Sequence, residues 1–114
     1  MKAWIITIPK KTKWEDYQLE LDAALQGEIL NFRVMNFPRK MEVGDRCYIV
    51  WNGKVRGWME ITGMVTADQP WQCTTTGQIW PAGNYIQRSG PFNEIDGPEM
   101  TGFRGIRKYY LDEY

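Results

Sequence analysis

The order of apolar and polar residues predicts a chain of short strands. Residues 2–9, KAWIITIP, form an apolar run rich in β-branched residues that ends at a proline, which favours a buried strand. Residues 29–35 alternate apolar and polar side chains, as in a short strand or extended segment. Residues 84–95 and 103–111 also read as strands, although Ser89-Gly90-Pro91 is expected to break the first of them.

One segment has helical spacing instead. Thr12, followed three residues later by Glu15, matches a capping box, and Gly27 is a typical stop signal. The pattern therefore predicts one amphipathic helix over about residues 13–26. Its apolar face would consist of Trp14, Tyr17, Leu21, Ala24 and Leu25.

A hairpin is predicted in the middle of the chain. Asn52-Gly53 is the strongest short turn signal in the sequence, and the strands around it are expected to cover residues 46–51 and 54–66. Two glycines inside the return strand indicate a bulge, a barrel bend, or the close approach of another backbone or a ligand.

The predicted turn also assigns side chains to the two faces of this hairpin. With a two-residue turn, Trp51 and Trp58 would share one face with Ile49 and Arg56. The opposite face is small and apolar and would line the interior of a barrel. A register shift of one residue would mix the two sets. The Trp face would then pack under the helix, cover a partner or line a cleft.

These elements predict the fold class. Five to six strands, mostly antiparallel, and one main N-terminal helix indicate an α+β fold, a small β-barrel capped by that helix. The length of 114 residues fits a single domain over residues 1–114. Residues 68–83 contain proline, glycine and two Trp and are expected to form a loop.

Charge narrows the class of function. Lys+Arg and Asp+Glu both number 14, so no net field draws the chain to nucleic acid. The basic residues cluster locally, which would allow contact with a few phosphates or leave ordinary solvated faces. The candidates for phosphate contact are Lys10, Lys11, Lys13, Arg39, Lys40, Arg88 and Arg104.

The absence of histidine excludes several kinds of site. Ser-His-Asp and Cys-His catalysis and imidazole metal sites are not available to this chain. Cys47 and Cys73 do not form a CxxC pair, and no glycine-rich phosphate loop of the usual spacing is present. We therefore expect no metal and no cofactor. The lack of a leader and of a long apolar run favours a cytoplasmic protein without a membrane partner.

Six Trp residues are many for a domain of this size. A small core cannot easily bury six indoles and give each N–H a partner, so two or three are expected in the core and the others at a surface or pocket. Trp14 would either line a pocket beside the neighbouring lysines or begin the apolar face of the helix, and the spacing favours the helix face. Trp71 and Trp80 would close over a ligand or pin a long loop to the body.

The order of these pieces resembles the PUA-like superfamily, and within it the EVE and ASCH domains. Residues 3–9, AWIITIP, are similar to the first strand of an EVE domain. Residues 31–65, NFRVMNFPRKMEVGDRCYIVWNGKVRGWMEITGMV, follow the EVE order of an asparagine-bearing loop, a Met-x-Val-Gly-Asp turn, an aromatic strand, a hairpin and a glycine-interrupted strand. Residues 100–110, MTGFRGIRKYY, are similar to the closing strand of several PUA-like domains.

The resemblance implies a nucleic-acid-binding module, for RNA or DNA. A flipped base, modified or unmodified, would be held between aromatic walls, where stacking contributes ~1–3 kcal/mol per base. The pocket would lie between the end of the first strand, the helix start, the asparagine loop and the hairpin. The residues that would form it are Thr7, Trp14, Asn36, Trp51, Trp58 and Trp80.

Two other functions fit the same sequence. An enzyme of ASCH type would act on RNA or a modified nucleobase through Lys, Thr, Tyr and Glu side chains. The lysine-glutamate signature of ASCH domains is not obvious here, so we favour binding over catalysis. A protein-interaction module would instead use exposed Trp residues as a patch on its surface.

Overall fold

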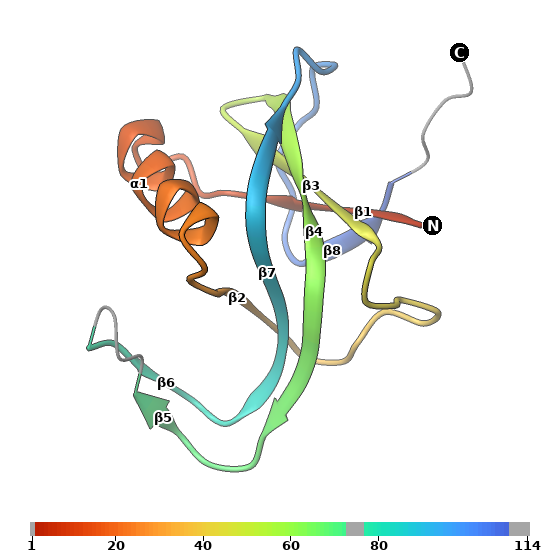
Figure 1. The fold of residues 1–114 in the computed structure, drawn as a ribbon. Helices are drawn as coiled ribbons and strands as arrows, with labels where there is room; N and C mark the ends of the chain where they lie inside the picture. The colour runs from red at the N-terminus through yellow and green to blue at the C-terminus, as the bar shows by residue number, and fades with distance from the viewer. Residues whose placement is uncertain (1, 73–76, 110–114) are drawn as a thin grey trace.

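The chain is mostly strand with one helix in the computed structural model, which describes residues 2–72 and 77–109 (Figure 1). Six strands form one sheet that curls into half a barrel. They are β1 (Ala3–Thr7), β2 (Leu30–Val34), β3 (Arg46–Trp51), β4 (Lys54–Ala67), β7 (Gly83–Glu94) and β8 (Ile106–Lys108).

The order of strands in this sheet is β2-β7-β4-β3-β1-β8. β1 runs parallel to β3, and the other neighbours are antiparallel. The α+β class and the mostly antiparallel, curled sheet agree with the prediction. The expected break at Ser89-Gly90-Pro91 does not end the strand, because β7 continues through it with register shifts against β4.

The expected loop over residues 68–83 contains two further strands. β5 (Trp71–Gln72) and β6 (Ile79–Trp80) pair with each other as a separate two-stranded sheet. Propensity did not predict this hairpin because each strand is only two residues long. It leaves the body of the protein at the ends of β4 and β7 (Figure 1).

The helix α1 (Trp14–Leu25) lies across the sheet, in contact with β7 (Figure 1). Tyr17, Leu21 and Ala24 are its buried residues, and Gly27, with φ +106°, follows its end as predicted. The predicted N-cap is wrong. Lys13 is the N-cap, without a side-chain hydrogen bond, because Thr12 belongs to the preceding turn, where its N–H donates to the carbonyl of Pro9.

A bulge in the hairpin of β3 and β4 overturns the predicted faces. Val50 pairs with Val55, but Ile49 pairs with Gly57, so β4 has one extra residue at this point. This shift turns Trp58 to the side of the sheet opposite to Trp51. The interior glycine is required here, because a Cβ at Gly57 would lie 2.3 Å from the ring of Phe92.

Apolar side chains are buried on both faces of the sheet. The larger cluster lies between the sheet and α1 and includes Trp4, Ile6, Ile49 and Ile61. The smaller cluster contains Ile5, and the segment that carries Met100, Phe103 and Tyr109 packs against it. The core position expected for Trp4 is confirmed, since 5 % of its surface is exposed.

A buried aspartate fixes the turn that precedes β3. The Asp45 carboxylate, 3 % exposed, accepts hydrogen bonds from the Trp4 indole N–H at 2.9 Å, the Glu42 N–H at 2.9 Å and the Lys2 N–H at 3.0 Å. Burial alone would raise the pKa of Asp45, but these donors and the Lys2 charge outweigh it and lower the pKa. Asp45 is therefore a structural anion.

None of the described residues forms a helix long and apolar enough to cross a membrane.

Candidate ligand-binding pocket

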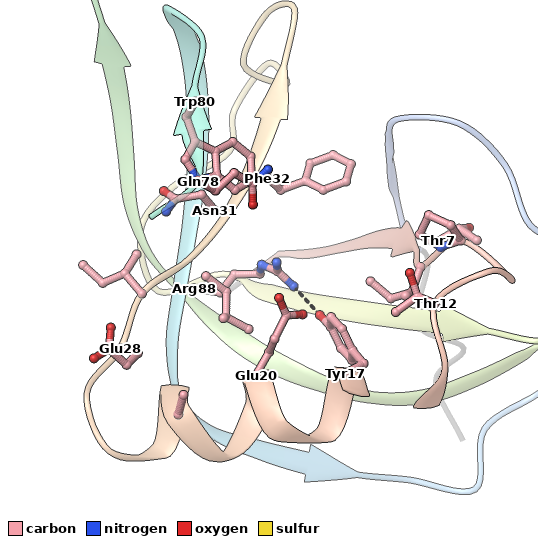
Figure 2. A pocket seen from close by; sticks show the side chains of 15 residues that line it. Thr7, Thr12, Tyr17, Glu20, Glu28, Asn31, Phe32, Gln78, Trp80 and Arg88 are labelled. Atoms are coloured by element: carbon pink, nitrogen blue, oxygen red, sulfur yellow. Dashed lines mark hydrogen bonds between the residues drawn. The ribbon is translucent and has the colours of Figure 1, made fainter. Parts of the chain in front are cut away.

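A cavity of about 280 Å³ lies between α1 and the curled sheet. The end of β1, α1, β2, β6 and β7 all contribute side chains to its lining (Figure 2). β1 and β2 are far apart in the strand order, so the curl of the sheet and the helix laid across it bring them to one cavity. Pockets for drug-sized ligands have volumes of roughly 300–1000 Å³, so this cavity suits a ligand the size of one base.

Arg88 is the one cation among the described residues that line the cavity, and 3 % of its surface is exposed. It lies in β7 between Leu30 of β2 and Ile61 of β4, so its backbone is fixed on both sides. Its Nη1 donates a hydrogen bond to the hydroxyl of Tyr17 at 3.0 Å (Figure 2). Its Nε is buried and has no hydrogen-bond partner among the described residues. A buried donor in this state costs about 1–3 kcal/mol.

The charge of Arg88 is only partly compensated. Burial disfavours this charge, but the interactions with Tyr17, Cys47 and Glu20 outweigh burial. They raise the pKa of Arg88, so the guanidinium stays charged. Burial also raises the pKa of Tyr17 and of Cys47, against the opposing effect of Arg88, so both groups are neutral near pH 7. The remaining negative neighbour is Glu20 of α1.

Glu20 and Arg88 face the same space without touching. Figure 2 shows the Glu20 carboxylate beside the guanidinium, but the two make no ion pair within 4.0 Å. Burial raises the pKa of Glu20, and the Arg88 charge offsets part of this shift. Since Glu20 lies at the exposed rim, this shift is weakened by solvent. The cavity therefore presents a fixed cation and a separate carboxylate to whatever enters it.

Aromatic rings form part of the wall. Trp80 of β6 stacks on Trp71 of β5, with ring centroids 5.8 Å apart and an angle of 12° between the planes. The rings of Tyr85 and Trp80 are nearly perpendicular, with their centroids 5.7 Å apart. The Tyr85 hydroxyl donates a hydrogen bond to the carbonyl of Pro81. These contacts hold the Trp80 indole in one orientation at the cavity. Phe32 of β2 lies near it on the same side of Arg88 (Figure 2).

The structure brings two of the six base-pocket candidates to this cavity, Thr7 and Trp80. Thr7 lies at the carboxyl end of β1, as expected, and its hydroxyl accepts the N–H of Phe103 at 3.2 Å. Trp80 reaches the cavity from the small hairpin rather than from a loop. Asn36 is exposed in the chain after β2 and does not line the cavity.

The other three candidates pack elsewhere. The rings of Trp14 and Trp51 pack together on the helix side of the sheet, with their centroids 5.5 Å apart. The Trp51 indole N–H donates a hydrogen bond to the carbonyl of Thr12 at 2.8 Å. Trp14 therefore begins the apolar face of α1, as its spacing favours. Trp58 lies on the opposite face, with the Arg46 guanidinium 3.9 Å from its ring centre. Of the six Trp side chains, Trp4 is buried and the other five are partly buried.

The basic residues expected to contact phosphates lie in different parts of the structure. Lys10 and Lys11 do not line the cavity, but they are exposed in the turn between Pro9 and Thr12, which do. The other expected phosphate contacts apart from Arg88 are also exposed and do not line the cavity: Lys13 follows Thr12 at the start of α1, and Arg39, Lys40 and Arg104 lie in other segments. Arg88 does not have the position expected of it, because its side chain is buried inside the cavity rather than solvated at the surface.

The sequence contains a signal for the cavity that spacing alone did not reveal. Along β7, Ile86 is buried in the cluster under α1, and Arg88 follows two residues later on the same face. A cation at an inward position of a strand needs a partner, and Tyr17 on the apolar face of the helix supplies a hydroxyl. An arginine in the inward register, paired with a tyrosine in a helical apolar stripe, indicates a buried polar site.

Comparison of the chain with protein-family models, with curated proteins and with solved structures found no match.

Proposed function

We propose that the chain is a PUA-like domain that binds single-stranded nucleic acid by holding one base in the cavity between α1 and the sheet. The observation that carries this proposal is the buried Arg88, which is aimed into a base-sized cavity beside an immobilised Trp80. The curled sheet with one helix laid across it is consistent with a PUA-like barrel.

A nucleobase satisfies what these side chains lack. Its ring has a face for stacking, and its edge has acceptor atoms for the guanidinium N–H groups of Arg88 that Tyr17 does not engage. A base enters such a cavity only when it is outside a duplex stack, which costs a few kcal/mol from a double strand. Single strands are therefore the favoured form of the ligand, whether RNA or DNA, and a methyl group on the base would extend the apolar contact.

The backbone of the strand would follow the surface at the mouth of the cavity. Lys10 and Lys11 are exposed there, next to residues that line the cavity, and each can contact one phosphate. For single strands the logarithm of the binding constant falls with the logarithm of salt concentration by about 0.7 for each phosphate contacted. Two contacts predict a shallow slope of about −1.4.

Intrinsic fluorescence tests the proposal. Short single strands of RNA and DNA, with plain and methylated cytosine or adenine, would be titrated into the protein at two salt concentrations. We expect saturable quenching that is much reduced in Trp80→Phe. The matched control is Trp58→Phe, because Trp58 is also partly buried but lies on the opposite face. Absence of binding to every strand at low salt would refute the proposal.

A second candidate function is an enzyme of ASCH type acting on RNA or a modified nucleobase. Glu20 favours it, because burial raises the pKa of this carboxyl, partly offset by Arg88, and it shares the cavity with Tyr17. A carboxyl in such a place can transfer protons to a bound ligand. Incubation with acylated nucleosides and with RNA, followed by chromatography, tests this candidate. Product that forms with the wild type and not with Glu20→Gln would favour catalysis over binding alone.

A further inference from the structure

We propose that the cavity selects guanine over the other bases, through an acceptor edge held by Arg88 and a donor edge held by Glu20. This inference rests on the proposed function, because it names the base that the same cavity would take. The two side chains lie on different elements, β7 and α1, and face one space without forming an ion pair.

Arg88 matches a ligand with acceptors. Its side chain lines the cavity, and the hydroxyl of Tyr17 satisfies only Nη1 of the guanidinium, at 3.0 Å. A guanidinium donates in a planar fork, and the commonest base contact of arginine is with O6 and N7 of guanine. Adenine offers N7 beside an amino group, which would direct a second donor at the guanidinium.

Glu20 requires a ligand with donors. An ionised carboxylate only accepts hydrogen bonds, and its two oxygens can accept from two adjacent N–H groups. Guanine has two such groups, N1–H next to O6 and the 2-amino group next to N1–H. Adenine and cytosine offer one exocyclic amino group, and uracil offers one ring N–H. Guanine is therefore the base that gives the carboxylate two donors while it also gives the guanidinium an acceptor.

The same charges argue against a phosphate as the occupant. Two carboxylates, Glu20 and Glu28, are among the residues lining the cavity, against one guanidinium. A phosphate dianion would be repelled by both carboxylates. A neutral base with a polar edge gains from the cation and from the acid together. The phosphates are better placed outside, at Lys10 and Lys11.

The test compares short single strands that carry one base each, with abasic residues on both sides. Guanine, adenine, cytosine, uracil and hypoxanthine would be the five test bases, and hypoxanthine is guanine without its 2-amino group. We expect guanine to bind at least about tenfold more tightly than adenine, cytosine and uracil, since one well-placed bidentate contact discriminates by that much. Hypoxanthine should fall between guanine and the other three.

Glu20→Gln should remove the preference of guanine over hypoxanthine, because an amide cannot accept from both N–H groups with both of its terminal atoms. Glu20 is exposed at the rim, so this variant is expected to fold. Glu15→Gln is the matched control, because Glu15 is an exposed acid of the same helix that does not line the cavity. It should keep the wild-type preference.

The outcomes separate this inference from the function beneath it. Equal affinity for all five bases, with quenching that still depends on Trp80, would overturn guanine selection and leave base binding in place. A preference of guanine over hypoxanthine that survives in Glu20→Gln would overturn the role of Glu20 in the selection. Absence of binding to every strand would overturn both proposals.

Discussion

Replacing Arg88 with methionine should remove ligand binding without weakening the free protein. Arg88 is a buried cation that forms no ion pair among the described residues, and its Nε donor has no partner there. Removing that unsatisfied donor should raise the free energy of unfolding by about 1–3 kcal/mol. Loss of the charged hydrogen bond to Tyr17 costs a similar amount, about 1.5–3 kcal/mol. The two effects nearly cancel, so the free energy of unfolding should stay within about 1 kcal/mol of the wild type.

The double variant Arg88→Met with Tyr17→Phe sharpens this prediction. It removes the hydroxyl that the single variant leaves buried without its donor. A buried polar group left without a partner costs about 1–3 kcal/mol, so we expect the double variant to be more stable than Arg88→Met by about 1–2 kcal/mol. For a domain of this size each kcal/mol raises the melting temperature by roughly 3–6 °C.

Thermal and urea unfolding, followed by circular dichroism, measure these changes. Arg39→Met is the control, since Arg39 is exposed and outside the cavity, and it should change neither stability nor base binding. A loss of more than about 3 kcal/mol in Arg88→Met, not recovered in the double variant, would refute the reasoning. It would mean that Arg88 is held by a structural partner rather than kept for a ligand.

Three further predictions concern stability and reactivity. The pKa of Asp45 is lower in the folded protein than in the unfolded chain. The contribution of Asp45 to the free energy of unfolding is therefore complete above the unfolded pKa of about 3.9 and is lost as the pH falls through the folded pKa. Asp45→Asn should therefore be less stable than the wild type by about 1–3 kcal/mol at pH 7, and urea unfolding below about pH 4 should show the difference shrinking. Gly57→Ala should lower the free energy of unfolding by about 1–3 kcal/mol in the same assay, because the new Cβ would lie 2.3 Å from the Phe92 ring. Cys47 is buried with a raised pKa, so in a Cys73→Ser background a thiol reagent should label it at the rate of unfolding; rapid labelling of the native protein would contradict its burial.

Local sequence signals predicted the parts of the fold that depend on local chemistry. The β-branched run before Pro9, the helical spacing that ends at Gly27 and the Asn52-Gly53 turn all correspond to elements of the structure. Each signal acts through neighbouring residues, by backbone conformation or by the period of apolar side chains. The curled antiparallel sheet with one helix follows from the order of these elements.

The missed features depend on contacts between distant segments. The bulge between β3 and β4 lies beside Gly57, where Phe92 from a distant part of the chain packs too closely for any side chain, and it places Trp58 on the other face. The hairpin that carries Trp80 is held by ring contacts with Tyr85 rather than by strand propensity. Charge patterns do not show which face of a strand turns inward, so the sequence alone places Arg88 among the surface cations.

The most direct test of base binding is an NMR titration of the indole N–H signals. The chain has six Trp residues, so six indole signals are expected, and single Trp→Phe substitutions would assign those of Trp80 and Trp58. Addition of a short single strand should shift the Trp80 signal in a saturable way, since its ring lies at the cavity, and leave Trp58 on the opposite face unchanged. Shifts confined to Trp58, or no shift at saturating strand and low salt, would contradict the assignment of the cavity as a base-binding site.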